Sequence, residues 1–112
     1  MVAITRKRGD TYAEEIIVKS KTTGLPVNIT GYTFKLTVDP KKDPLTADNN
    51  LFSITGTILN PTAGTVEFAP SALQADQTPG VYFYDIQMVD GAGRIRTIEL
   101  DKWTVQQDIT KT

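Results

Sequence analysis

The residue types that carry most enzyme chemistry are missing from this chain. Its 112 residues contain neither cysteine nor histidine, which removes thiol nucleophiles, imidazole bases, disulfides and the usual zinc and haem ligands. Ser20, Ser53 and Ser71 thus lack an activating histidine, and none stands in a Gly-x-Ser-x-Gly context. Adjacent carboxylates such as Glu14 and Glu15 point to opposite faces of a strand and cannot share a glycosidic substrate. The sequence predicts a protein that is not an enzyme, with no cofactor and no catalytic residue.

A second candidate for chemistry is the hydrophilic stretch DPKKDPLTADNN, residues 39–50. Its carboxylates and amides are hard oxygen ligands that could gather Ca²⁺; they are Asp39, Asp43, Asp48, Asn49 and Asn50. They lack the alternating spacing and central glycine of a calcium-binding loop, and Lys41 and Lys42 stand among them. The stretch is therefore expected to be a long solvated surface loop, with Ca²⁺ binding left open. Both charge signs and several amides, without an aromatic ring, suit the polar rim of a protein–protein contact.

Arg8-Gly9-Asp10 spells an adhesion tripeptide. Integrin recognition requires an exposed loop tip, whereas this motif is predicted to lead directly into a strand. Gly9 is expected to permit a bend between the first two strands, and Asp10 to hydrogen-bond nearby backbone amides. Arg6, Lys7 and Arg8 form the only basic cluster, which we interpret as a solvated strand end. The net charge of -1 argues against a nucleic-acid partner.

The elements that must position these residues are short strands. Period-two alternation recurs in runs rich in Val, Ile, Thr, Tyr and Phe. The runs are residues 2–8, 11–20, 31–39, 51–59, 64–70, 80–90 and 94–110. The one helical signal is SALQADQ, where Ser71 is a candidate N-cap of a single turn before the Tyr82 strand. About seven strands with regular turn signals predict one all-β domain over residues 1–112, an antiparallel two-layer β-sandwich.

Strand alternation also predicts the core. The expected buried residues are Phe34, Leu36, Phe68, Tyr82, Tyr84, Ile86 and Trp103. Tyr82 follows Gly80 at the start of a strand, so it is either a tyrosine corner or a plain core residue. Asp85 is expected to pair with Arg94 or Arg96 across two strands. The apolar parity of the last run changes near Asp101-Lys102, which predicts a β-bulge or break there.

Contacts with other chains are expected at two places. The first and last strands, VAITRKR and WTVQQDIT, are the predicted sheet edges, and one of them is expected to bind another chain by strand addition or arm exchange. On this hypothesis, deletion of residues 1–7 weakens association and leaves the fold intact. The candidate interface residues at the first edge are Val2, Ile4 and Arg6, and those in the loop are Asp39, Lys41, Lys42, Asp43, Asp48 and Asn49.

Five motifs give the chain a resemblance to a known family. They are Arg8–Thr11, the G-x-P-V-x-[LI]-T-G turn at Gly24–Gly31, G-x-Y-x-Y-D-[IV]-Q at Gly80–Gln87, D-G-x-G-R at Asp90–Arg94 and D-[IV]-T at Asp108–Thr110. In this order and register the chain resembles the immunoglobulin-like N-terminal domain of the phage baseplate upper protein and its free-standing relatives. The family usually has a glycine before its final strand, where this chain has Asp101-Lys102.

The resemblance implies an immunoglobulin-like β-sandwich and a structural role in a tailed-phage virion, in the tail, the baseplate or a head decoration site. The implied partners are other phage structural proteins and further copies of the chain, with no nucleic acid, membrane or small-molecule substrate. We expect synthesis in the host bacterial cytoplasm, since MVAITRKRGD holds no signal-peptide core. The alternative is a carbohydrate-binding adhesion module on the particle surface. It would need an exposed aromatic shelf, but most aromatic residues fall on the inward parity of their strands.

Overall fold

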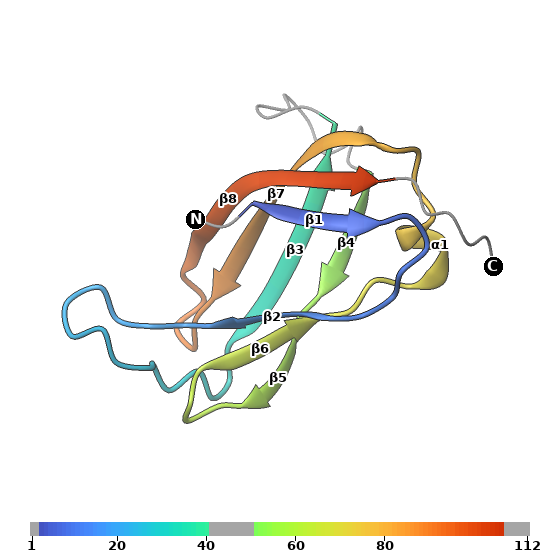
Figure 1. Cartoon of the computed structure of the whole chain (residues 1–112). Helices are drawn as coiled ribbons and strands as arrows, with labels where there is room; N and C mark the ends of the chain where they lie inside the picture. Colours follow the sequence, from blue (N-terminus) through green and yellow to red (C-terminus); the bar gives the residue numbers. More distant parts are fainter. Residues whose placement is uncertain (1–2, 41–50, 107–112) are drawn as a thin grey trace.

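A computed structural model describes residues 3–40 and 51–106 of the chain (Figure 1). The first strands are β1 (Ile4–Lys7), β2 (Glu14–Ile17), β3 (Thr33–Asp39) and β4 (Phe52–Thr55). They are followed by β5 (Thr57–Asn60), β6 (Thr65–Phe68), the helical turn α1 (Ala72–Ala75), β7 (Gly80–Val89) and β8 (Ile95–Gln106). Ser71 caps α1 as predicted, and its hydroxyl accepts a hydrogen bond from the Gln74 N–H.

The strands form two sheets. One has the order β1-β8-β7-β3-β4 and the other β2-β6-β5; in Figure 1 the smaller sheet lies across one face of the larger. With β2 to β8 lettered B, C, C′, D, E, F and G, these are the B-E-D and G-F-C-C′ sheets of an immunoglobulin-like sandwich. The predicted β-sandwich is confirmed, with one correction: β1 pairs with β8 in parallel.

Gly56 stands where the chain passes from the larger sheet to the smaller, between β4 and β5. A Cβ atom there would lie 2.8 Å from Cβ of Phe34 and 2.8 Å from Cγ1 of Val66, far inside normal van der Waals contact. The crossing between the sheets therefore passes through a position that only glycine can occupy without displacing core residues.

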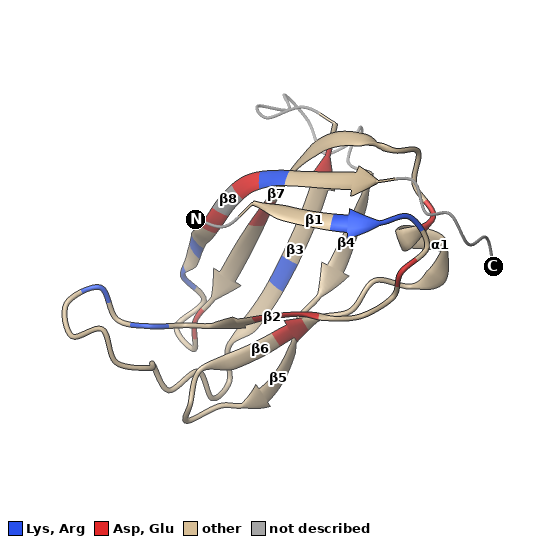
Figure 2. Ribbon diagram, in the orientation of Figure 1, with Lys and Arg blue, Asp and Glu red and all other residues tan. Residues whose placement is uncertain are grey.

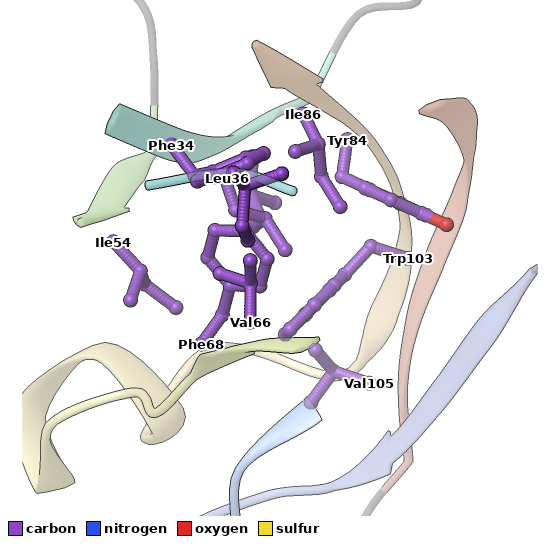
Figure 3. Packing of buried hydrophobic residues seen from close by; sticks show 11 residues of the cluster. Phe34, Leu36, Ile54, Val66, Phe68, Tyr84, Ile86, Trp103 and Val105 are labelled. Atoms are coloured by element: carbon purple, nitrogen blue, oxygen red, sulfur yellow. The ribbon is translucent and has the colours of Figure 1, made fainter. Parts of the chain in front are cut away.

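The core fills the space between the sheets (Figure 3). Six of the seven predicted core residues are buried: Phe34, Leu36, Phe68, Tyr84, Ile86 and Trp103. The seventh, Tyr82, is half-buried, and its hydroxyl donates a 2.6 Å hydrogen bond to the Thr78 carbonyl. Tyr82 therefore makes the tyrosine-corner contact in addition to packing against the core.

The predicted irregularity in β8 exists, but at a different place. Ile86 pairs with Glu99 and Gln87 pairs with Thr97, so Ile98 is the extra residue of a β-bulge. The prediction at Asp101-Lys102 was wrong because Ile98 still packs against the core from its bulged position. The alternation of apolar residues therefore changes at Asp101-Lys102, whereas the backbone register already shifts at Ile98.

Two pairing predictions were also wrong. Trp103–Gln106 is not an edge, because β1 lies on one side of it and β7 on the other. Asp85 stands opposite Thr37 and Leu100, whereas Arg94 forms its ion pair with Asp90, at 3.3 Å. Asp90 and Arg94 lie in the same β7–β8 turn, so Arg94 pairs with this neighbouring carboxylate and not with Asp85 across the sheet.

Truncation of Phe34 tests the core. We expect Phe34→Ala to lower the free energy of unfolding by about 3–5 kcal/mol, because a large ring that is 2% exposed leaves a cavity. Leu73→Ala on α1, where Leu73 is 82% exposed, is the matched control and should change stability little. Equal urea midpoints for the two variants would contradict this description of the core.

Candidate interaction surface

The basic residues of the described chain are distributed over β1, β3, β8, the loop after β2 and the turns after β1 and before β8 (Figure 2). The predicted basic cluster at the end of β1 is not a freely solvated strand end. Lys7 donates a hydrogen bond to the Gln106 side chain at 2.7 Å, and Arg8 pairs with Asp76 at 2.9 Å. Arg6 is 4% exposed. Each of the three cations therefore has a partner within the chain.

Arg6 connects the two sheets. From β1 in the larger sheet, its Nη1 donates a 2.9 Å hydrogen bond to Glu14 Oε1 on β2 in the smaller sheet. Its Nη2 donates to the backbone carbonyls of Asp10 and Tyr12, at 2.9 and 2.6 Å. Hydrogen bonds to an ionised donor are roughly twice as strong as neutral ones. One side chain thus ties β1, the following turn and β2 together.

Two aromatic rings complete the surroundings of the Arg6 guanidinium. Its central carbon lies 3.8 Å from the centroid of the Tyr12 ring and 5.7 Å from that of Trp103. These distances fit cation–π interactions. Trp103 is 3% exposed and packs edge-on against Tyr84, so the prediction of a core role for Trp103 is confirmed.

The Arg-Gly-Asp motif follows β1 and makes the turn toward β2. Gly9 has φ +87°, so the predicted bend at this glycine is confirmed. The Gly9 N–H donates to the Ala75 carbonyl, and Arg8 is ion-paired to Asp76, both of which attach the turn to the α1 segment. Asp10 contributes its backbone carbonyl to Arg6. The motif therefore fastens a turn, and its arginine is engaged within the chain.

These contacts change the list of candidate interface residues. Arg6 and Asp39 are buried, at 4% and 5% exposure, so neither offers a surface for contact. Ile4 is half-buried and packs against the core. Val2, Lys41, Lys42, Asp43, Asp48 and Asn49 lie outside the described residues, as does the Ca²⁺ alternative that depends on most of them.

Deletion of residues 1–7 would now be expected to disturb the fold, contrary to the sequence-based hypothesis. The deletion removes the parallel partner of β8 and the guanidinium that pairs with Glu14. A test of the β1 edge therefore needs substitutions at exposed positions such as Thr5.

The free edge of β4 is partly covered. The Gln74 side chain donates a 3.0 Å hydrogen bond to the Ser53 carbonyl on β4. The same side chain accepts the Ser71 N–H in the capping box. Such coverage is one way in which sandwiches keep edge strands from pairing with other chains. The opposite edge of the larger sheet is formed by β1 and β8.

The sequence did not identify the first two thirds of β8 as an edge. β8 has 12 residues and β1 has 4, and β1 pairs only with Trp103–Gln106. The segment Ile95–Lys102 thus extends beyond β1, with β7 as its one strand partner among the described residues. The available signal was that the last apolar run, residues 94–110, is longer than the first, residues 2–8. This difference indicates an open edge only when the two runs are known to pair.

Acidic side chains gather on the inner side of this segment. Glu99 stands opposite Ile86 and Asp101 opposite Tyr84, both of which are core residues. The Tyr84 hydroxyl donates to Glu99 Oε2 at 3.3 Å. Burial first, and then the negative charge of Glu99, raise the pKa of Tyr84 well above its usual range. The phenol therefore remains a neutral hydrogen-bond donor to Glu99 at physiological pH.

No family model and no curated protein sequence matches this chain. Among solved structures, it is similar to the N-terminal domain of phage TP901-1 ORF48, with a TM-score of 0.55 and 15% sequence identity, over 94% of this chain and 85% of that chain. It is also similar to CopC from Methylosinus trichosporium OB3b, with a TM-score of 0.54 and 10% identity, over 99% of this chain and 91% of that chain. At such identities the likeness shows a shared fold. In the described residues, no helix is long and apolar enough to cross a membrane.

Replacement of Arg6 tests its connecting role. We expect Arg6→Met to lower the free energy of unfolding by about 3 kcal/mol, because Glu14 and two backbone carbonyls lose their shared donor. Lys7→Ala, one residue away on the exposed side of β1, should stay within about 0.5 kcal/mol of the parent. Chemical denaturation of both variants measures the difference, and equal stabilities would remove Arg6 from this role.

Asp85 gives a pH-dependent prediction. Burial raises its pKa above the ordinary value of 3.8, so its ionised form opposes folding at every pH above the folded-state pKa. Asp85→Asn should therefore raise the melting temperature at neutral pH, and the gain should disappear as the pH falls to about 3.8 and below.

Asp90 is the control of opposite sign. Hydrogen bonds from the Arg94 and Ala92 backbone N–H groups, with the Arg94 charge, lower its pKa, so its ionised form stabilises the fold above pH 3.8. Asp90→Asn should lower the melting temperature at neutral pH and lose this effect in acid. A melting-temperature change of the same sign for both variants at neutral pH would contradict the assignment.

Proposed function

We propose that this chain is a non-enzymatic building block of a tailed-phage virion that acts through protein–protein contacts, in the tail, the baseplate or a head decoration site. The observation that carries this proposal is the ordered set of motifs that resembles phage baseplate upper protein N-terminal domains. The fold neighbour from phage TP901-1 supports it. CopC has a similar fold at a similar TM-score, so the fold alone does not favour a phage role. The sequence motifs carry that part of the proposal.

Two of the motifs, Gly24–Gly31 and Asp90–Arg94, lie where the fold needs special backbone conformations. Gly24 and Gly31 begin and end the turn motif before β3, with φ of +71° and +81°. In the β7–β8 turn, Asp90 accepts the Ala92 and Arg94 N–H groups, and Gly93 has φ +82°. A family relationship accounts for all of these residues at once, whereas an unrelated sandwich can use other turns.

The alternative, a carbohydrate-binding adhesion module, requires exposed aromatic faces. In the described residues, Tyr12 is the aromatic side chain with a large exposed fraction, 52%, and its ring already carries the Arg6 guanidinium at 3.8 Å. The remaining described aromatic residues are buried or half-buried. This arrangement favours a protein partner over a sugar.

The direct test is mass spectrometry and cryo-EM of the purified particle, which should contain this chain at defined positions. A companion variant replaces residues 40–50 with a turn of about four residues and keeps the buried Asp39. We expect nearly unchanged thermal stability, because loop length costs little, together with weaker incorporation into the particle.

Glycan-array binding should be absent for both the parent and the shortened form. A particle that lacks the chain would overturn the structural role. Binding of the parent to one host polysaccharide, lost in the shortened form, would instead establish the adhesion module.

A further inference from the structure

Among the described residues, the segment Ile95–Lys102 of β8 is an open sheet edge. β1 lies beside the last third of β8 (Figure 1) and pairs with Trp103–Gln106. On its other side the segment pairs with β7. An edge of this kind presents a row of backbone N–H and C=O groups that another strand can bond.

Hydrogen bonds near the two ends of β8 indicate which of its backbone N–H and C=O groups face away from β7. The Asp90 N–H donates to the Arg94 carbonyl, so by the alternation of an antiparallel ladder Ile95 and Thr97 direct their N–H and C=O groups away from β7. At the other end, the Arg8 N–H donates to the Gln106 carbonyl. Backbone groups alternate between the two sides of a strand, so the N–H and C=O groups of Lys102 and Leu100 point to the same side as those of Gln106, away from β7.

The bulge at Ile98 changes which residues direct their backbone groups outward: odd-numbered residues do so before the bulge and even-numbered residues after it. Two copies of the segment placed antiparallel can therefore match their outward groups. Ile95 of one copy lies opposite Lys102 of the other, and Thr97 lies opposite Leu100. A regular strand without the bulge would not give this combination.

Charges on the inner face fit the same register. Arg96 stands opposite Met88, and Asp101 opposite Tyr84, so both side chains lie on the face that carries the core. In the antiparallel match, Arg96 of one copy lies opposite Asp101 of the other, twice by symmetry. Opposite charges at directly facing positions stabilise a strand pair, and like charges oppose it.

We propose that the Ile95–Lys102 edge of β8 binds the same edge of a second copy of this chain, antiparallel, around a two-fold axis between Ile98 and Glu99. The two larger sheets then form one continuous sheet. The contact is isologous, in which each copy gives and receives the same residues. This proposal does not depend on the virion role.

Two features of the single chain are consistent with this occupant. The Lys102 N–H is held by the Asp101 carboxylate at 2.7 Å, a local bond that covers the edge until a second strand takes its place. Ile95 is 68% exposed beside the charged positions, and the second copy would cover it. The inward charges also disfavour strands of unmatched sequence, which gives the edge selectivity.

The experiment is sedimentation velocity of the intact chain over a concentration series. A contact through one strand edge is at the small end of specific interfaces, so we expect a monomer–dimer equilibrium in the micromolar range or weaker. Thr97→Pro removes an outward N–H and should abolish the dimer. Thr5→Pro, which removes an outward N–H from the β1 edge, is the matched control and should leave it unchanged.

Charge reversal tests the register. Arg96→Glu and Asp101→Arg should each weaken dimerisation by about tenfold or more, since each places like charges opposite one another. An equimolar mixture of the two variants should dimerise like the parent, because each mixed dimer restores both opposite-charge pairs. Thermal melts of each variant confirm that the monomers remain folded.

Sedimentation as a monomer at every concentration would overturn the proposal. So would a dimer that Thr5→Pro dissolves and Thr97→Pro does not, since β1 would then be the interface. Failure of the mixture to associate, with both variants folded, would exclude the pairing of Arg96 with Asp101.

Discussion

The ion pair between buried Arg6 and Glu14 is the interaction on which the arrangement of this sandwich most depends. It joins the larger sheet to the smaller one, and the same guanidinium holds the carbonyls of the connecting turn. A buried guanidinium is costly unless all of its donors are used and its charge is matched. Here the backbone carbonyls, the Glu14 carboxylate and the Tyr12 and Trp103 rings share that task. The result is a short strand whose position on β8 is well defined.

The position of β1 decides what the rest of the larger sheet presents to solvent. Because β1 is short and pairs in parallel with the end of β8, it closes the edge beside Trp103. Among the described residues, Ile95–Lys102 is left with β7 as its one strand partner. The far edge carries the Gln74 side chain on the Ser53 carbonyl. The two edges therefore differ in kind, one covered by a side chain and one limited by a bulge and inward charges.

This asymmetry is consistent with the proposed role in protein–protein contact. The core between the sheets is a cluster of apolar side chains, and the arginine of the Arg-Gly-Asp turn is ion-paired within the chain. At the β8 edge, the surface available to a partner consists of backbone groups, charged side chains and the exposed Ile95. Such surfaces give selectivity through register and charge more than through apolar area.

The sequence by itself determined the layers, the core and the turns. Alternation over Thr33–Asp39 and Gly80–Val89 is local and has period two, so it identifies Phe34, Leu36, Tyr84 and Ile86 as inward residues without knowledge of any partner strand. Ser71 and the glycines at positions 9, 24 and 93 act through backbone geometry within a few residues. Only the tertiary structure decided the burial of Arg6, the parallel pairing of β1 and the bulge at Ile98. The parallel pairing joins the first strand to the last, and the bulge depends on the register between β7 and β8. A charged side chain is buried only where the fold supplies its partners, as the turn after β1 and Glu14 on β2 do for Arg6.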